Sequence, residues 1–433
     1  MDKFITNKIG YKGEEIYSAA VYYYGTMQDL QNTYTIVFKM DEDIDPIALR
    51  KALDMCQIRY PYLMVKIKKT LSKYSLEYNE KPIVIKNSEK PLSLSSSESN
   101  DHFLGINYYG NTLNFCAFHG LIDGNGAFNF LRTLMYYYIS DRYGETPSAD
   151  GVKLVADEID PEEYTDPYLD FIPDKNAQPL VMKKEKAPTF RIAEKDKRVH
   201  LSGPHYFFVK VPQKDFIKYC RANDASPATL FNILIARAVK KLNPDTSDSI
   251  DGGLANDLRP ALGKLKSHYS SVGTLTLSYD EKIQKMDIEM QNTAFRGKTI
   301  LANDIDNVKA GLAGSKKFFD IVKKIPLAAI KKTLLQKIIK MNLGLQTFMV
   351  SYVGKANLGD AEKHIQGIYS NPDSPGTNIM LEVNAVNENF YLSFVQEWKE
   401  KSYFEAFCNE MNNIGLNYEL VEEGDLYIPK AEL

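Results

Sequence analysis

Apolar and polar side chains alternate at several places in the first third of the chain, as expected for strands with one buried face. The clearest case is TYTIVFKM at 33–40, which is also rich in β-branched and aromatic residues. Asp45 and Pro46 then supply a helix N-cap and a proline at the first helical position. This pattern predicts strands at 33–40, 63–67, 75–78, 83–86, 103–109 and 112–117, and helices at 46–59 and 126–139.

A similar mixture of strands and helices returns in the second half of the chain. Strands are predicted at 206–211, 250–256, 274–279, 347–353, 379–386 and 389–394, and helices at 213–223, 227–242, within 286–343 and at 403–414. Between Ser140 and Pro204 the pattern dissolves into prolines and clustered charges, with room for a short helix at 161–164. We therefore expect an N-terminal half at 1–165, a crossing linker at 166–204 and a C-terminal half at 205–433.

The composition is that of a folded globular protein. Of the 433 residues 44% are apolar, and the net charge of −3 lacks the basic excess of a dedicated nucleic-acid-binding protein. No stretch approaches the roughly 20 apolar residues that span a bilayer, and residues 1–13 lack the apolar core of a secretory signal. The four cysteines are far apart and form no C-x-x-C pair. We expect a cytoplasmic protein without a nucleic-acid partner.

His119 is the residue whose sequence neighbours indicate a chemical role. It follows a predicted strand, lies in a glycine-containing turn, and precedes Asp123 by four residues. An imidazole with a pKa near 6.5 is largely neutral at pH 7 and can accept a proton as a general base. Asp123 could orient the ring or pair with a cation, and the alternative is a buried structural histidine beside a helix-capping aspartate. A metal site is disfavoured because the sequence supplies no third ligand nearby.

The segment FHGLIDG at 118–124 resembles the H-x-x-x-D-G motif of the chloramphenicol-acetyltransferase-like superfamily, which includes CoA-dependent alcohol acetyltransferases and the condensation domains of peptide synthetases. Five further segments resemble this family in the expected order along the chain. They are DPIALRKALDMCQIRYPYL at 45–63 with its R-x-P-x-L ending, the apolar helix at 225–239, NDLRP at 256–260, Val272-Gly273, and SYVG at 351–354.

The resemblance implies a mixed α/β (α+β) monomer of two chloramphenicol-acetyltransferase-like halves, each a mixed β-sheet with flanking helices, around a central tunnel. His119 would be the general base, at the point where donor and acceptor meet. Asp123 would support the catalytic loop through a salt bridge with Arg259, whose guanidinium fork can hold a carboxylate at two points. Gly124 would belong to the same supporting loop.

The implied activity is transfer of an acyl group from a CoA thioester, with acetyl-CoA as the expected co-substrate, to an alcohol or amine, without a bound cofactor or metal. Two alternatives stay open: a condensation-type enzyme with a carrier-protein-bound donor, and a non-catalytic binding protein on the same fold. Phe118 stands where many condensation domains have a first histidine, which favours enzymes acting on free alcohols or amines. The D-F-G-W-G motif of plant acyltransferases is absent from the sequence.

Such a reaction needs a hydrogen-bond donor for the oxyanion of the tetrahedral intermediate. The sequence offers Ser351 and Ser270 as candidates, together with the hydroxyl groups of Tyr269 and Ser271. Cys116 precedes His119 by three residues and is interpreted as a core residue rather than a nucleophile.

A basic, amphipathic stretch extends from Lys316 to Lys340, with eight lysines against one acidic residue, Asp320. The favoured interpretation is a solvated helical face that covers the core. The alternatives are peripheral contact with an anionic membrane surface and contact with the phosphates of CoA or a carrier protein.

Overall fold

The computed structural model describes residues 17–168, 171, 187–373 and 377–433. Within them, the alternating segment TYTIVFKM forms β1 (Thr33–Met40), which lies inside a five-stranded sheet of order β11-β1-β6-β5-β4. β1 runs antiparallel to β6 and to β11, and its register pairs Thr33 with Phe118 at the end of β6. The other strands of this half are β2 (Val65–Lys69), β3 (Tyr74–Tyr78), β4 (Ile85–Asn87), β5 (Leu104–Tyr109) and β6 (Thr112–Phe118).

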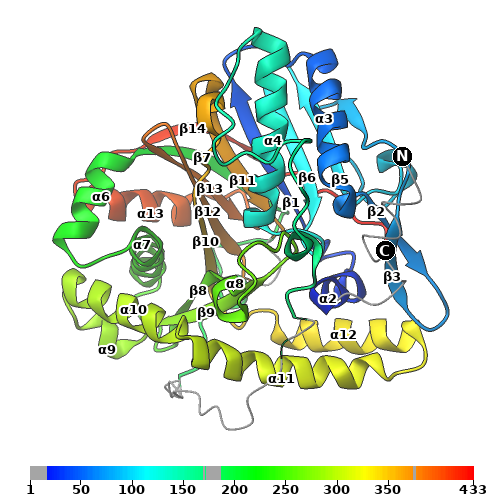
Figure 1. Cartoon of the computed structure of the whole chain (residues 1–433). Coiled ribbons are helices and arrows are strands. Elements are labelled where there is room, and N and C mark those ends of the chain that lie inside the picture. The colour runs from blue at the N-terminus through cyan, green and yellow to red at the C-terminus, as the bar shows by residue number, and fades with distance from the viewer. Residues whose placement is uncertain (1–16, 169–170, 172–186, 374–376) are drawn as a thin grey trace.

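Two long helices, α3 (Pro46–Arg59) and α4 (Gly124–Tyr143), pack together against one face of this sheet (Figure 1). The carboxylate of Asp45 accepts hydrogen bonds from the N–H groups of Ile47 and Ala48, so the predicted N-cap of α3 is confirmed. The remaining helical elements of this half are α2 (Tyr17–Gly25), η1 (Pro61–Leu63), η2 (Ser97–Ser99) and η3 (Pro161–Tyr164).

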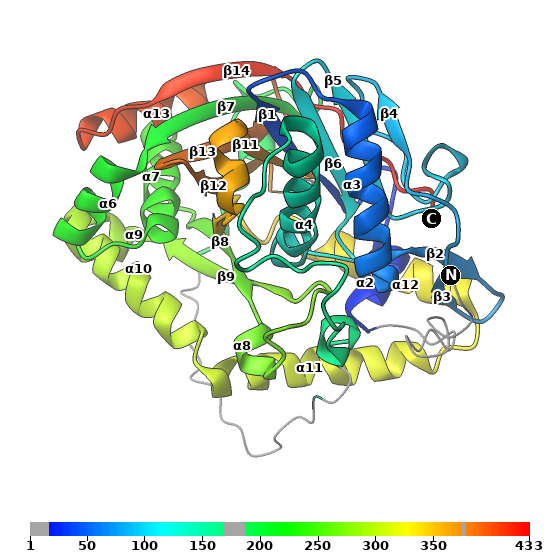
Figure 2. The same ribbon diagram turned by 45° about the horizontal axis from the view of Figure 1, so that its top comes forward.

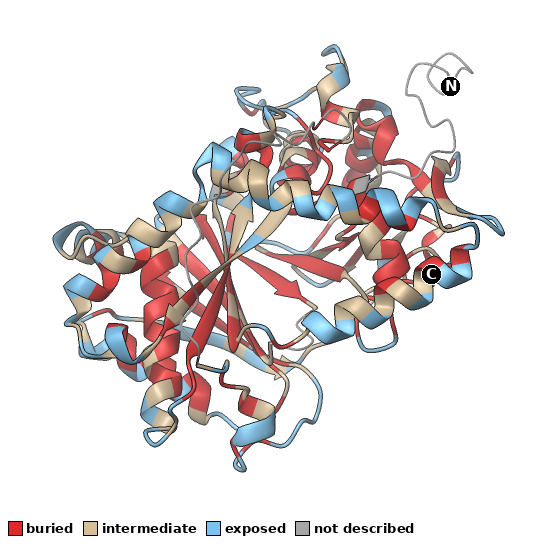
Figure 3. Ribbon diagram, turned by 90° about the horizontal axis from the view of Figure 1, so that it is seen from below, coloured by how far each residue is buried: buried red, intermediate tan, exposed pale blue. Residues whose placement is uncertain are grey.

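The second half contains a larger sheet of order β14-β7-β13-β12-β10-β8-β9, most of whose strands are buried (Figure 3). Its strands are β7 (His205–Pro212), β8 (Ile250–Asp257), β9 (Val272–Tyr279), β10 (Phe348–Lys355), β12 (Ile379–Val386), β13 (Asn389–Gln396) and β14 (Glu419–Asp425). The helices are α5 (Ile192–Lys195), α6 (Gln213–Ala222), α7 (Pro227–Leu242), α8 (Arg259–Leu262), α9 (Glu281–Gln284), α10 (Ile288–Ala302), α11 (Ile305–Lys323), α12 (Ala328–Asn342), α13 (Ser402–Asn413) and η4 (Gly359–His364). The predicted fold class, two halves that each combine a sheet with flanking helices, is confirmed.

One strand joins the two halves. β11 (Ile365–Pro372) lies within the second half in the sequence, between β10 and β12, but it pairs antiparallel with β1 at the edge of the first sheet. The sequence pattern gives no signal for it, because IQGIYSNP contains a glycine and ends in Asn-Pro, which weakens a strand pattern. The sheet of the first half is therefore completed by residues outside 1–165.

The expected linker at 166–204 is only partly visible, because residues 169–170 and 172–186 lie outside the described residues. Residues 1–13, considered above for a secretory signal, also lie outside them. The end of the linker packs into the second half: Phe190 and Ile192 are buried in its core, and Thr189 forms a β-bridge with Ser249. The last part of the linker is thus structurally continuous with the second half.

The basic stretch from Lys316 to Lys340 forms the end of α11 and most of α12, which run along one side of the molecule from the second half to the first (Figure 2). Phe319 and Leu335 are buried in the core of the first half, as the core-covering interpretation requires. Ile321 and Ile330 are about half exposed, at 56% and 50%. Contact of this surface with a membrane or with phosphates stays a prediction.

Among the described helices, none has the length and apolar character needed to cross a lipid bilayer.

Candidate active site

His119 lies at the junction between β6 and α4, where the two halves meet. Strand pairing continues one residue past β6, because the main-chain N–H of His119 donates to the carbonyl oxygen of Asn32 over 2.7 Å. The next helix begins at Gly124, so the segment FHGLIDG forms the strand-to-helix turn that the sequence predicts. The residue is partly exposed and lines a cavity between the two sheets.

Two tyrosine rings and one hydroxyl group hold the His119 imidazole. The ring of Tyr22 stacks on it at 5.3 Å, and the ring of Tyr34 approaches edge-on at 5.4 Å. The hydroxyl oxygen of Ser270 lies 3.4 Å from Nδ1.

Burial lowers the pKa of His119, against the opposing effect of the nearby Asp123 carboxylate. A histidine with a lowered pKa is neutral at pH 7 and can accept a proton. The lowered pKa therefore favours a proton-accepting imidazole over a permanently charged one.

Asp123 interacts with Arg259 rather than with the imidazole. Its carboxylate is 1% exposed and lies 2.8 and 2.9 Å from Nη2 of Arg259. It also accepts hydrogen bonds from the main-chain N–H groups of Gly126 at 3.0 Å and Ser271 at 2.8 Å. Of the two roles considered for Asp123, the structure shows the pair with a cation. The contact differs from the expected fork in one detail: a single guanidinium nitrogen faces both carboxylate oxygens.

Arg259 extends this contact to the loop that carries Ser270. Its Nε donates to the carbonyl oxygen of Ser267 at 2.7 Å, and Nη2 donates to that of Tyr269 at 2.8 Å. Nη1 pairs with Asp257 at 2.9 Å. The guanidinium therefore fixes both the start of α4, through Asp123, and the hydroxyl group beside His119.

A second buried ion pair supports the same loop from the other side. Arg59, from the R-x-P-x-L ending of α3, meets the Glu163 carboxylate at two points, both 2.9 Å long. Tyr62 donates to Glu163 at 2.8 Å and lies 2.7 Å from Nδ1 of His268. Hydrogen bonds from Arg59 and Tyr62 lower the pKa of Glu163 although burial opposes them, and burial lowers the pKa of His268 to about 4. Sequence reasoning noticed Arg59 but supplied no partner for it, because Glu163 is 104 residues away.

Two glycines allow close packing at the start of α4: Gly124, the last residue of the motif, and Gly126, two residues beyond it. A Cβ atom at Gly126 would lie 2.1 Å from the carbonyl oxygen of His268, and one at Gly124 would lie 3.2 Å from the side chain of Val353. α4 can thus approach the second half only if position 126 has no side chain. The two halves are held together at the candidate site by backbone contact as well as by ion pairs.

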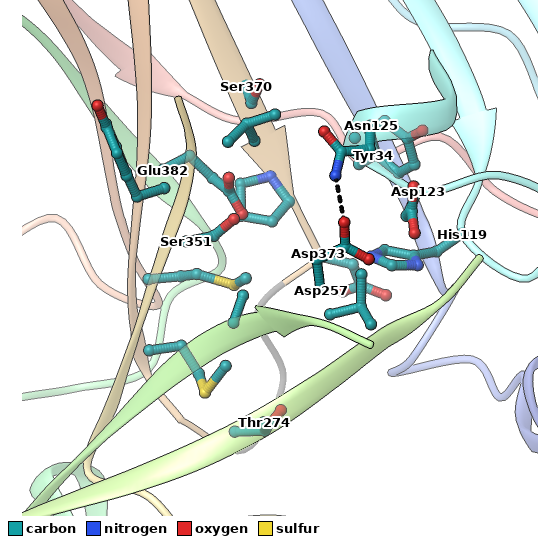
Figure 4. A pocket seen from close by; sticks show the side chains of 18 of the residues that line it. Tyr34, His119, Asp123, Asn125, Asp257, Thr274, Ser351, Ser370, Asp373 and Glu382 are labelled. Atoms are coloured by element: carbon teal, nitrogen blue, oxygen red, sulfur yellow. Dashed lines mark hydrogen bonds between the residues drawn. The ribbon is translucent and has the colours of Figure 1, made fainter. Parts of the chain in front are cut away.

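The cavity beside His119 has a volume of about 280 Å³ and is lined by both sheets. Among the four candidate oxyanion donors, Ser351 on β10 lines it (Figure 4). Tyr269, Ser270 and Ser271 do not belong to its lining, and the hydroxyl group of Ser271 donates to the carbonyl oxygen of Tyr269. Whether the cavity continues as a tunnel through the molecule stays a prediction.

Two acidic side chains that sequence reasoning did not single out also line this cavity, Glu382 on β12 and Asp373 just after β11. Burial raises the pKa of each to about 7. A glutamate in the middle of the apolar strand IMLEVNAV is the signal that could have revealed the first of them.

Cys116 is buried in the core of the first half, as predicted, and burial raises the pKa of its thiol to about 12. Such a thiol is not ionised at neutral pH and is a poor nucleophile. In the described part of the chain, no three His, Cys, Asp or Glu side chains gather in a way that could hold a metal ion.

Comparison with solved structures shows that the chain has the fold of the chloramphenicol-acetyltransferase-like, CoA-dependent acyltransferases. One similar structure is F. graminearum TRI101, solved with coenzyme A and deoxynivalenol, at a TM-score of 0.58 and 14% identity, covering 91% of this chain and 98% of that one. The condensation domain of the monacolin K polyketide synthase MokA has a TM-score of 0.56 at 13% identity, with 92% and 94% covered. Polyketide synthase associated protein 5 from Mycobacterium tuberculosis has a TM-score of 0.54 at 12% identity, with 92% and 96% covered. No family model and no curated protein sequence matches this chain.

Proposed function

We propose that this protein is an acyltransferase that moves an acyl group from a CoA thioester to an alcohol or amine. The observation that carries the proposal is the position of the His119 imidazole, packed against Tyr22 and Tyr34 at a cavity between the two halves. The fold supports it, since a TRI101 structure with this fold was solved with coenzyme A. We propose acyl-CoA as a co-substrate and assign no resident cofactor.

In the proposed reaction, the acceptor hydroxyl or amine attacks the thioester carbonyl while His119 takes its proton. A new carbon–oxygen or carbon–nitrogen bond forms, and the carbonyl oxygen becomes an oxyanion. Collapse of this tetrahedral intermediate breaks the carbon–sulfur bond, and the departing thiolate receives the proton from His119. Of the four candidate oxyanion donors, Ser351 is the one that lines the cavity, and we propose it for this role. Its hydroxyl group would turn from Glu382 to the oxyanion, and such a donor contributes about 3–4 kcal/mol.

In this mechanism Asp123 and Arg259 do not touch the substrate. They fix the loop that carries His119 relative to the loop that carries Ser270, so they act as positioning residues.

The second candidate function is condensation with a donor tethered to a carrier protein. The structural likeness to condensation domains, such as that of MokA, favours it. The chemistry at His119 would be the same, and only the carrier of the thioester would differ.

A thiol-release assay with several acyl-CoAs, starting with acetyl-CoA, against pooled alcohols and amines tests the proposal. His119→Ala should lower turnover by about 10²–10⁴-fold, the range for loss of a general base, without changing the melting temperature. His200→Ala, which removes an exposed histidine, is the matched control and should leave turnover unchanged.

Equal turnover by the His119→Ala variant and the unaltered protein would contradict the mechanism. Failure with every acyl-CoA, together with release from a loaded carrier protein, would favour condensation. Failure with both kinds of donor would leave a non-catalytic binding protein on this fold.

A further inference from the structure

The wall of the cavity that faces His119 carries an acidic group in an apolar strand. Along β12, Leu381, Val383 and Ala385 face the core of the second half. Strand alternation turns Met380 and Glu382 to the other side, where both line the cavity. Glu382 is 8% exposed, so its carboxyl group is buried and the cavity is the space open to it.

Among the described residues, Glu382 has a hydroxyl partner but no cationic one. Its hydrogen bond comes from Ser351, the residue opposite it on β10. Figure 4 shows these two side chains on one side of the cavity and His119 on the other. The described cation in the lining is Arg259, and its guanidinium is already paired with Asp123 and Asp257.

Asp373 adds a second carboxyl group to the same cavity. It accepts hydrogen bonds from the main-chain N–H groups of Gln31 at 2.5 Å and Asn32 at 3.0 Å. These donors are neutral, and no cationic side chain of the described residues pairs with the Asp373 carboxyl group. Burial raises the pKa of both carboxyl groups to about 7, and no cationic side chain among the described residues offsets this effect.

A buried carboxylate without a cationic partner costs free energy, which a positively charged ligand recovers on binding. A neutral alcohol carries no positive charge that could pair with this carboxylate, and CoA is itself an anion. We infer that the acceptor carries a protonated amino group, which binds at Glu382 with Asp373 adding negative potential, while a second group of the same molecule, a hydroxyl or free amine, faces His119. This inference rests on the proposed function and narrows its acceptor to amino alcohols and diamines.

Calorimetric titration of the full chain with α,ω-diamines, amino alcohols and diols of matching length tests the inference without requiring turnover. The amino compounds should bind more tightly than the diols. Glu382→Gln, which keeps the shape but removes the charge, should weaken their binding by about 10- to 100-fold and leave diol binding unchanged. Asp373→Asn should act in the same direction.

Glu388→Gln is the matched control, because this glutamate is exposed in the turn that follows β12. It should bind the amino compounds like the unaltered protein. Amino compounds that bind no better than diols, or a Glu382→Gln variant with the normal melting temperature that binds them equally well, would overturn the inference. The thiol-release assay separates the two proposals. Turnover of diols without preference for amino alcohols would overturn only the inferred amino acceptor. Absence of turnover with all donors would overturn the proposed function, and the titration would then decide whether the cavity prefers a positive charge.

Discussion

At the scale of single residues, Asp123 is the point where groups from both halves meet. It caps α4, accepts from Ser271, and neutralises Arg259, all without exposure to solvent. Removing one member of a buried ion pair leaves the other charge without compensation. The stability of the site therefore depends on this carboxylate more than on the imidazole beside it.

We predict that Asp123→Ala lowers the free energy of unfolding by about 3–5 kcal/mol and lowers the melting temperature accordingly. Asp257→Asn is the control, because Asp257 pairs with the same guanidinium but its side chain is 36% exposed. Its loss should cost about 1 kcal/mol or less. Thermal and denaturant unfolding measure both changes, and an unaltered melting temperature in Asp123→Ala would contradict the assigned role.

The lowered pKa of His119 predicts the pH dependence of turnover. A base must be deprotonated to act, so activity is lost as the pH falls through its pKa. Because burial lowers this pKa, kcat/KM with a neutral alcohol acceptor should rise to its plateau with a midpoint below 6.5, the ordinary histidine value. A midpoint above 6.5 would show that another group limits the rate or that the ring is not desolvated.

At the scale of elements, the packing at the start of α4 requires a residue without a side chain. Gly126 lies against the carbonyl oxygen of His268, and any Cβ would overlap it. The contact places the helix that follows His119 against the loop that carries Ser270. This packing explains Gly126, two residues beyond the FHGLIDG motif, by steric contact rather than by a positive φ angle.

Alanine substitution of two helical glycines should therefore have opposite effects. Gly126→Ala should destabilise the protein and reduce turnover, because His268 or α4 must move. Gly297→Ala, in the interior of α10 with no atom within 4 Å of the added Cβ, should stabilise by about 0.5–1 kcal/mol through helix propensity. Chemical denaturation of both variants measures the difference, and equal stability would refute the close contact at 126.

At the scale of the whole molecule, the second half contributes structural elements to the first. β11 leaves the second half to pair with β1, and α12 packs against α2 of the first half. Without β11, one edge of β1 would expose unpaired main-chain groups. The halves therefore form one folding unit, even though each has its own sheet.

Residues 1–165 expressed alone should not fold into a stable domain, and neither should 205–433. Near-ultraviolet circular dichroism and thermal unfolding test this, with the full chain as reference. A fragment 1–165 that melts cooperatively by itself would show that β11 is dispensable for the first half.

The sequence alone determined the local features whose causes are local. Strand alternation at β1, the Asp45 cap of α3, and the glycine-containing turn after His119 follow from neighbouring residues, and their predictions are confirmed. The resemblance of FHGLIDG to the family motif predicted the fold, and the comparison with solved structures confirms that prediction. The role of His119 as a base stays a prediction that the geometry supports.

Only the tertiary structure decided which distant residues meet. The partner of Arg59, the strand beside β1, and the acidic wall formed by Glu382 and Asp373 involve residues widely separated in sequence. No local pattern encodes such contacts, because they arise when two sheets and a crossing strand bury their apolar faces together. The same burial removes water from the cavity groups, and it is this loss of solvation that shifts the pKa of His119 down and those of the two carboxyl groups up.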